Sequence, residues 1–239
     1  MSTEQAPRTA IVTGAASGIG RAVCERLVAD GWRVVGIDLA EAALPGGELL
    51  VGDAGDPALL ARSVEAAGDR LDGLVCAAGV PPRRPWDDPG LWDEAIRVDL
   101  TAPFTAVRIA WPALRAARGS VVLVGSIVGT VEGSLRSAGY AAAKAGLEGL
   151  ARSAALVGGP DGVRVNVVAP GPIETSFDEP LLSPDARADV PLGRMGSADE
   201  VAGAIAWLLG PDASYVTGSV LRVDGGRSIL AAAEALRKG

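Results

Sequence analysis

Short runs of β-branched residues alternate with segments of helical periodicity along almost the whole chain. Several of the runs are apolar on both faces, which is typical of parallel strands covered by helices on both sides. The expected strands are residues 9–13, 33–37, 49–51, 73–77, 120–124, 163–168 and 219–223. The expected helices are residues 18–30, 57–67, 91–117, 140–156 and 198–209. The alternation predicts an α/β fold, a doubly wound seven-stranded parallel sheet with helices on both faces.

No internal repeat or low-complexity linker interrupts this alternation, so the 239 residues are expected to form a single domain. The polar residues 1–8 are expected to be flexible. Residues 172–192 form the one long irregular stretch, and a loop of that length in a compact domain is usually a lid, here over the substrate. The long helix over 91–117 is expected to bend near Pro103 and Pro112, which remove hydrogen-bond donors.

The composition excludes several kinds of chemistry. The chain has no histidine, so a Ser-His-Asp hydrolase, a Cys-His protease or a His-ligated zinc site cannot be built from it alone. We expect no metal site, and general acid–base work must come from Asp, Glu, Lys, Tyr or Cys. A net charge of −7 without a long basic run argues against nucleic acid as a partner.

The sequence also predicts where the protein resides. No stretch of 18 apolar residues would span a membrane, and the polar N-terminus lacks the features of a secretory signal. The two cysteines do not form a close pair, which is typical of buried thiols in a reducing compartment. We therefore expect a cytoplasmic protein with no membrane partner.

A glycine-rich turn follows the first expected strand and opens the first helix. Its glycines allow a tight turn and a close approach to a pyrophosphate, and the helix N-terminus offers free N–H groups. The spacing is Gly-x-x-x-Gly-x-Gly, and taken alone it could also be a turn without a ligand. The cofactor-binding candidates here are Gly14, Ser17, Gly18, Ile19 and Gly20.

Asp38 ends the second expected strand, 18 residues after Gly20. This is near the spacing of about 20 residues expected for an acid that binds the adenosine ribose. A carboxylate there accepts hydrogen bonds from both ribose hydroxyls and repels a 2′-phosphate, and no Lys or Arg between Gly14 and Gly20 offsets the repulsion. These features favour a Rossmann-type site for NAD over NADP, although Asp38 could also be a plain turn residue.

Tyr140 and Lys144 lie four residues apart in an alanine-rich helix, on one face. A neighbouring ammonium favours the phenolate, which suits Tyr140 to proton transfer near neutral pH. Such pairs are common on surfaces, so this one is weak evidence alone. Ser126 ends the fifth strand at the sheet edge where ligands bind, and it could hydrogen-bond a substrate oxygen or merely cap the strand.

Together these residues resemble the short-chain dehydrogenase/reductase family in its single-domain form, and especially the group of 3-oxoacyl-carrier-protein reductases and hydroxysteroid dehydrogenases. The resemblance spans residues 9–226, and the conjunction of motifs is specific although each motif is not. The motifs that carry it, in the order of the family, are the turn at 13–20, Asp53, Ala78, Gly79, Ser126, Tyr140, Lys144, Asn166, Pro170, Gly171, 191–194, 217–218 and 223–226.

The resemblance implies a role for each of these residues. Tyr140 would be the acid/base, Ser126 would hold the reacting oxygen, and Lys144 would bind the nicotinamide ribose and tune Tyr140. The further cofactor contacts that it implies are Asp53, Ala54, Ala78, Gly79, Pro170, Gly171, Ile173 and Thr175. It also implies a homotetramer, with a dimer as the alternative, in which helices 91–117 and 140–156 pack between subunits.

Two positions depart from the family pattern. Residues 76–79 read Cys-Ala-Ala-Gly where the family usually has Asn-Asn-Ala-Gly. Asp99 stands where the family usually has an Asn that holds a water linking the lysine to solvent. We therefore include Asp99 among the catalytic candidates, with the hypothesis that it keeps the water relay and alters its pH dependence. The alternative is that Asp99 merely caps the bent helix.

The leading interpretation is an NAD-dependent oxidoreductase acting on a secondary alcohol or ketone, with Tyr140 as the acid/base. An NADPH-dependent reductase of 3-oxoacyl-carrier-protein or polyketide intermediates is the alternative, with Arg83 and Arg84 as a small docking patch. A non-catalytic NAD-binding scaffold is a third interpretation. An apolar substrate pocket is expected from Val80, Pro81, Trp86, Ile127, Val128 and Phe177, with packing in the core or the lid as the alternative.

Overall fold

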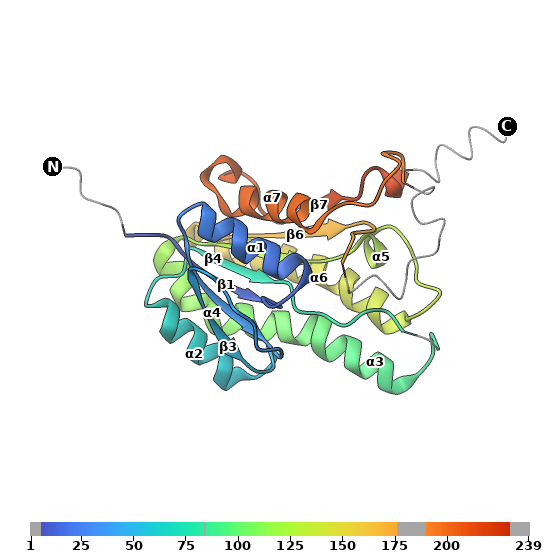
Figure 1. Ribbon diagram of the computed structural model, residues 1–239, viewed down its shortest axis with the longest axis horizontal. Coiled ribbons are helices and arrows are strands. Elements are labelled where there is room, and N and C mark those ends of the chain that lie inside the picture. The colour runs from blue at the N-terminus through green and yellow to red at the C-terminus, as the bar shows by residue number, and fades with distance from the viewer. Residues whose placement is uncertain (1–5, 84, 176–189, 230–239) are drawn as a thin grey trace.

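Seven parallel strands form one sheet in the order β3-β2-β1-β4-β5-β6-β7, which confirms the predicted doubly wound sheet (Figure 1). The computed structural model describes residues 6–83, 85–175 and 190–229. The strands are β1 (Thr9–Thr13), β2 (Arg33–Asp38), β3 (Gly47–Val51), β4 (Gly73–Cys76), β5 (Ser120–Val124), β6 (Arg164–Pro170) and β7 (Val220–Val223). Most of the lid predicted over 172–192, and Phe177 within it, fall outside the described residues.

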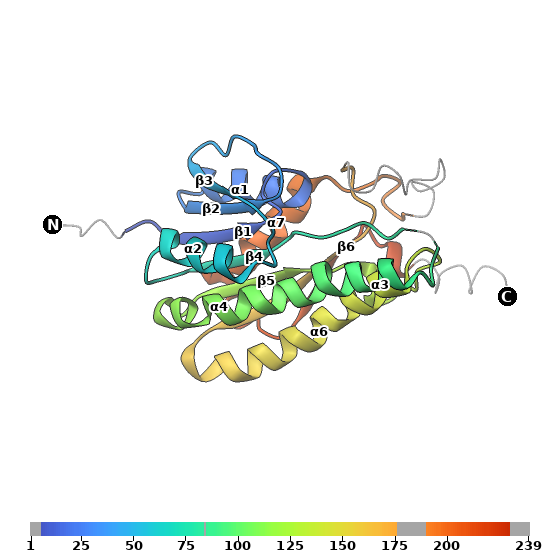
Figure 2. The same cartoon turned by 90° about the horizontal axis from the view of Figure 1, so that it is seen from below.

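Helices cover both faces of the sheet. The α-helices are α1 (Gly18–Ala29), α2 (Pro57–Ala67), α3 (Pro89–Ile96), α4 (Ala102–Ala117), α5 (Ile127–Thr130), α6 (Ala138–Gly158) and α7 (Ala198–Leu209). Helices α1 and α7 pack together on one face, and α2, α4 and α6 cover the other (Figure 2). Within the described ranges, no helix has the length and apolar character needed to cross a membrane.

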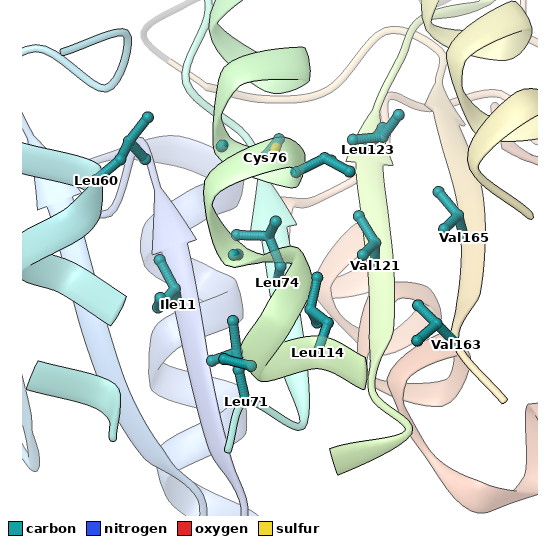
Figure 3. Close-up of a cluster of buried hydrophobic side chains, with 14 of the residues drawn as sticks. Ile11, Leu60, Leu71, Leu74, Cys76, Leu114, Val121, Leu123, Val163 and Val165 are labelled. Atoms are coloured by element: carbon teal, nitrogen blue, oxygen red, sulfur yellow. The ribbon is translucent and has the colours of Figure 1, made fainter. Parts of the chain in front are cut away.

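The strands are apolar on both sides because each face of the sheet has its own core. Successive strand residues point to opposite faces, so Ile11 and Leu74 pack toward Leu114 of α4 (Figure 3). Val12 and Val75 instead pack into the cluster that includes helices α1 and α7. This arrangement explains why the expected strands read as continuous apolar runs and not as alternating ones.

The helical stretch predicted over 91–117 consists of three consecutive elements. Helix α3 runs into a π-helical segment, η1 (Arg97–Thr101), which leads into α4. The N–H of Ala102 donates to the carbonyl of Arg97, five residues back. Pro103 has no N–H for the carbonyl of Asp99 four residues earlier, which favours this wider turn. The interruption therefore lies just before Pro103, while α4 continues through Pro112.

The order of the strands predicts where a ligand-binding crevice lies. The chain runs outward from β1 to β3 in one direction and from β4 to β7 in the other. In sheets of this kind, ligands bind beyond the carboxyl ends of the strands, where the two directions separate. The glycine-rich turn follows β1, and the segments after β4, β5 and β6 meet it at the same edge.

Candidate active site

A cleft with a cavity volume of about 340 Å³ lies at this edge of the sheet. Ser126 lines it, as does every residue predicted to bind the cofactor. These are Gly14, Ser17, Gly18, Ile19, Gly20, Asp38, Asp53, Ala54, Ala78, Gly79, Tyr140, Lys144, Pro170, Gly171, Ile173 and Thr175. Of the predicted site residues, only Asp99 does not line the cleft, because its side chain is fully buried behind it.

The glycine-rich turn comes so close to the segment after β4 that side chains would not fit. Gly14 has a φ of +73°, and a Cβ on it would lie 2.8 Å from the backbone nitrogen of Ala78. A Cβ on Gly20 would strike the carbonyl oxygen of Gly14. The N-cap of α1 is Ser17, whose side chain makes no capping hydrogen bond. The turn therefore presents backbone and a helix N-terminus to the cleft, a cradle that fits a pyrophosphate.

Two carboxylate side chains, those of Asp38 and Asp53, line the cleft together with the glycine-rich turn. The Asp38 carboxylate accepts hydrogen bonds from the N–H groups of Ala16 and Ala40, both at 2.9 Å, which fix it at the end of β2. Asp38 thus serves as a turn residue and also faces the cleft. Asp53 forms an ion pair with Arg97 at 3.0 Å. Both partners of that pair are about half exposed, so it adds little stability.

Tyr140 and Lys144 lie on the buried face of α6, with 7% and 5% of their surfaces exposed. The helix begins at Ala138, two residues before the predicted start, because the Ser137 hydroxyl caps it by accepting from the Tyr140 N–H at 3.1 Å. The Lys144 Nζ lies 5.5 Å from the centre of the Tyr140 ring. The spacing of four residues does place the phenol and the ammonium together at the cleft.

Ser126 follows β5 and is the N-cap of the short helix α5. Its Oγ accepts a hydrogen bond from the Val128 N–H at 3.1 Å, and its carbonyl accepts from the Thr130 hydroxyl at 2.6 Å. The side chain is held as an acceptor on one side, so its O–H remains able to donate to a ligand oxygen. Ser126 lines the cleft, and the cap that it forms is the N-cap of a helix and not the predicted strand cap.

Lys144 forms a buried ion pair with Asp99. Its Nζ lies 3.2 Å from Asp99 Oδ1 and donates to the Val124 carbonyl at 3.1 Å. Burial lowers the pKa of the Lys144 ammonium, but Asp99, with a further contribution from Tyr140, outweighs burial and raises that pKa overall. Burial likewise raises the pKa of the Asp99 carboxyl, with Lys144 opposing it. The residue singled out by sequence as a departure thus contacts the lysine directly.

The other departure, at residues 76–79, changes little in the site. The Thr13 hydroxyl accepts hydrogen bonds from the N–H groups of Ala77 and Ala78, both at 3.2 Å, and braces the end of β4. The Cys76 thiol lies among apolar side chains of the sheet core (Figure 3). Burial, weakly opposed by Lys144, raises its pKa to about 12, so the thiol stays neutral.

The predicted substrate pocket is only partly brought together. Val80 lines the cleft, whereas Pro81, Trp86, Ile127 and Val128 do not. The sequence did not predict that Glu94 of α3 and Arg97 of η1 also line the cleft. Their spacing of three residues, which places two side chains on one face of a helix, was the only sequence feature that links them. The remaining lining residues are Leu39, Gly52, Ala77, Val98, Ala102, Val124 and Gly125.

Known proteins are similar to this chain over nearly its whole length. A family model described as enoyl-(acyl carrier protein) reductase matches residues 14–228. The 3-oxoacyl-[acyl-carrier-protein] reductase FabG of Salmonella typhimurium is 39% identical, covering 92% of this chain and 96% of the relative. The cis-4-hydroxycyclohexanecarboxylate dehydrogenase of Sinomonas cyclohexanicum is 42% identical, with the same coverage. A solved oxidoreductase of the short-chain dehydrogenase/reductase family from Burkholderia thailandensis has a TM-score of 0.88 and 33% identity, covering 98% of this chain and 99% of that one.

Proposed function

Because this chain belongs to the short-chain dehydrogenase/reductase family of oxidoreductases, we propose that it interconverts a secondary alcohol and a ketone with NAD as its cofactor. One observation carries the proposal. Ser126, Tyr140 and Lys144 line the same cleft as the glycine-rich turn and Asp38. The groups suited to proton transfer therefore line the same cleft as the groups suited to binding a dinucleotide.

The cleft fits a dinucleotide at both ends. The turn at Gly14 and Gly20 leaves no room for side chains and offers backbone to the pyrophosphate. Asp38 would accept from the adenosine ribose, Asp53 would lie near the adenine, and Lys144 would bind the second ribose. When bound, NAD supplies the acceptor for the hydride that leaves the alcohol carbon.

The side chains of this protein would handle the oxygen and its proton. The Ser126 O–H donates to the substrate oxygen and holds it. The Tyr140 phenolate oxygen takes the proton of the alcohol during oxidation, and the phenol returns it during reduction. The Lys144 ammonium stabilises the phenolate form through its positive charge. This division of labour needs no imidazole, in keeping with a chain that lacks histidine.

Asp38 supports NAD over NADP. Its carboxylate is fixed by two backbone N–H groups, so it cannot easily turn away from a 2′-phosphate. A fixed negative charge repels that phosphate and accepts from the ribose hydroxyls. Titration of both oxidised cofactors would test this: we expect tighter binding of NAD, and tighter binding of NADP would refute the preference.

An activity screen tests the proposal as a whole. Purified protein is assayed with NAD and with NADP against cyclic alcohols, hydroxysteroids, sugar alcohols and 3-hydroxyacyl thioesters, following the absorbance of the reduced nicotinamide. We expect NAD-dependent turnover of at least one class. Binding of NAD without turnover of any of them would instead favour the non-catalytic scaffold.

A reductase of 3-oxoacyl or polyketide intermediates on a carrier protein is the second candidate, favoured by the similarity to FabG. An acidic carrier would need a basic surface near the cleft. Arg83 is already paired with Glu94 at 3.3 Å, and Arg84 lies outside the described residues. Faster turnover of a carrier-bound 3-oxoacyl thioester with NADPH than of any free alcohol with NAD would favour this candidate.

We also propose that the chain assembles as a homotetramer, with a dimer as the alternative. Helices α4 and α6 cover the same face of the sheet (Figure 2). Of their apolar residues, Leu156 and Val157 are largely exposed and Phe104 is about half exposed. Such apolar surface is typical of subunit contacts. Light scattering on the wild type and on Leu156→Glu would test it; a wild-type monomer would refute it.

A further inference from the structure

Asp99 is a carboxylate with no exposed surface. Its Oδ1 accepts from the Val80 N–H at 3.3 Å and lies 3.2 Å from the Lys144 Nζ. Among the described residues, its Oδ2 has no hydrogen-bond partner. A buried carboxylate is costly unless a positive charge balances it, and the Lys144 ammonium favours the ionised form of Asp99.

The backbone keeps Asp99 out of the cleft. The residue sits in the π-helical segment η1, and a Cβ on Gly79 would lie 2.6 Å from its Oδ1. Gly79 lines the cleft and Asp99 does not. The carboxylate is therefore packed behind the wall of the cleft and does not touch a bound molecule there. Asp99 therefore acts on the cleft through the groups that it contacts, the Lys144 ammonium and the Val80 N–H.

Three further titratable groups among the described residues act on this ion pair. Helix α6 contributes Tyr140 beside Lys144 itself, β4 contributes the Cys76 thiol, and Glu94 of α3 acts on Asp99. The thiol is neutral because its pKa is raised to about 12. Glu94 is paired with Arg83. Tyr140 is thus the neighbour whose charge changes during the proposed reaction.

Asp99 weakens the field that Lys144 exerts on that phenol. An isolated ammonium in a buried site favours a nearby phenolate strongly. With a carboxylate 3.2 Å from the Nζ, the negative charge offsets part of the field that the ammonium exerts on the Tyr140 ring, 5.5 Å from the Nζ. We propose that Asp99 is a positioning residue that, through its ion pair with Lys144, makes the Tyr140 phenol ionise at higher pH than it would beside an unpaired lysine.

The inference rests on the proposed function, in which Tyr140 exchanges the proton, for its relevance to catalysis. The electrostatic part has a definite sign. Removing a negative charge lowers the proton affinity of every neighbouring group, so both Tyr140 and Lys144 release protons at lower pH without it. For the phenol, this sign holds while Lys144 keeps its proton as Tyr140 ionises, because a neutral amine would no longer favour the phenolate.

The chain allows a direct measurement because it has only two tyrosines. Tyr215 is fully exposed, so Tyr215→Phe leaves Tyr140 as the sole phenol. The near-ultraviolet absorbance of the phenolate then reports Tyr140 alone, without cofactor or substrate. In this background we expect Asp99→Asn to lower the pH midpoint of the titration by about one unit.

Glu148→Gln is the matched control, since Glu148 is a carboxylate one helical turn from Lys144 that pairs with Arg152 instead. We expect it to leave the midpoint in place. Asp99→Ser, smaller and also uncharged, is measured beside Asp99→Asn, and a thermal melt selects the folded variant. An unchanged or raised midpoint in a folded Asp99 variant overturns the inference.

The pH profile of turnover links the ion pair to catalysis. For an active enzyme, we expect Asp99→Asn to move the ionisation seen in the kcat profile in the same direction as the absorbance midpoint. A protein that proves inactive refutes the proposed function while the absorbance titration still decides the electrostatic claim. A shifted midpoint with an unshifted kcat profile would overturn the influence of Asp99 on the reaction.

Discussion

The two ends of the cleft are built from different materials. At the dinucleotide end, the surface is mainly backbone, and the glycines of the turn are needed for the space that they leave empty. At the proton-transfer end, the surface is made of side chains that include Lys144, and its partner Asp99 is buried behind them. Added side-chain volume should therefore impair the dinucleotide end, and a change of side-chain charge should impair the proton-transfer end.

The largest effect is expected from breaking the buried ion pair on one side. Lys144→Met leaves the Asp99 carboxylate uncompensated, which typically costs about 3–5 kcal/mol of unfolding free energy. Denaturant titration measures the loss. The double variant Lys144→Met/Asp99→Asn should recover most of it, because no charge is then left buried. Equal unfolding free energies of the single and double variants would mean that the uncompensated charge of Asp99 is not what destabilises the Lys144→Met variant.

Ser126→Ala comes next, because it removes the O–H proposed to hold the substrate oxygen. Loss of one such donor lowers kcat by about 100-fold in comparable sites. Steady-state kinetics with the best substrate of the screen gives the figure, and the affinity for NADH should not change. A similar fall in NADH affinity would show that the two ends of the cleft are not separable in this way.

Added volume at the dinucleotide end should weaken cofactor binding. Gly14→Ala places a methyl group 2.8 Å from the Ala78 nitrogen at a φ of +73°, and the left-handed conformation alone costs about 1–2 kcal/mol. We expect the Kd for NADH to rise about tenfold. Gly149→Ala is the control, since a Cβ there meets nothing within 4 Å. Equal affinities in the two variants would break the argument from close packing.

The smallest effect is expected at Asp38, one of the two carboxylates at the end that is built mainly from backbone. Asp38→Ser removes the repulsion of a 2′-phosphate, worth about 1 kcal/mol in solvent. The ratio of NADP to NAD affinity should rise about fivefold, as measured by fluorescence titration of the reduced forms. No change in the ratio would mean that Asp38 acts only as a turn residue.

The sequence predicted what depends on local pattern. Ile11 and Val12 are consecutive apolar residues in β1, and Leu74 and Val75 are in β4. Such runs predicted strands that are buried on both sides, and both faces of the sheet do carry helices. The shared face of Tyr140 and Lys144 followed from helical spacing alone. The start of α6 was misplaced because the Ser137 cap lies outside the apolar pattern.

Features set by tertiary packing could not be read in this way. Arg97 reaches the cleft because η1 widens the helix ahead of Pro103 and brings that turn against Asp53. The direct contact of Asp99 with Lys144 joins two distant elements, η1 and α6. The sequence showed that Asp99 was unusual, but only its position behind Gly79 showed which group it acts on.

The separation of binding from proton transfer is tested most directly by Tyr140→Phe. The substitution removes one hydroxyl from the proton-transfer end and leaves the glycine-rich turn and Asp38 untouched. We predict that kcat falls by at least about 100-fold while the Kd for NADH, measured on the same preparation, stays the same. Retained turnover, or a loss of NADH binding that accounts for the lost activity, would contradict the account.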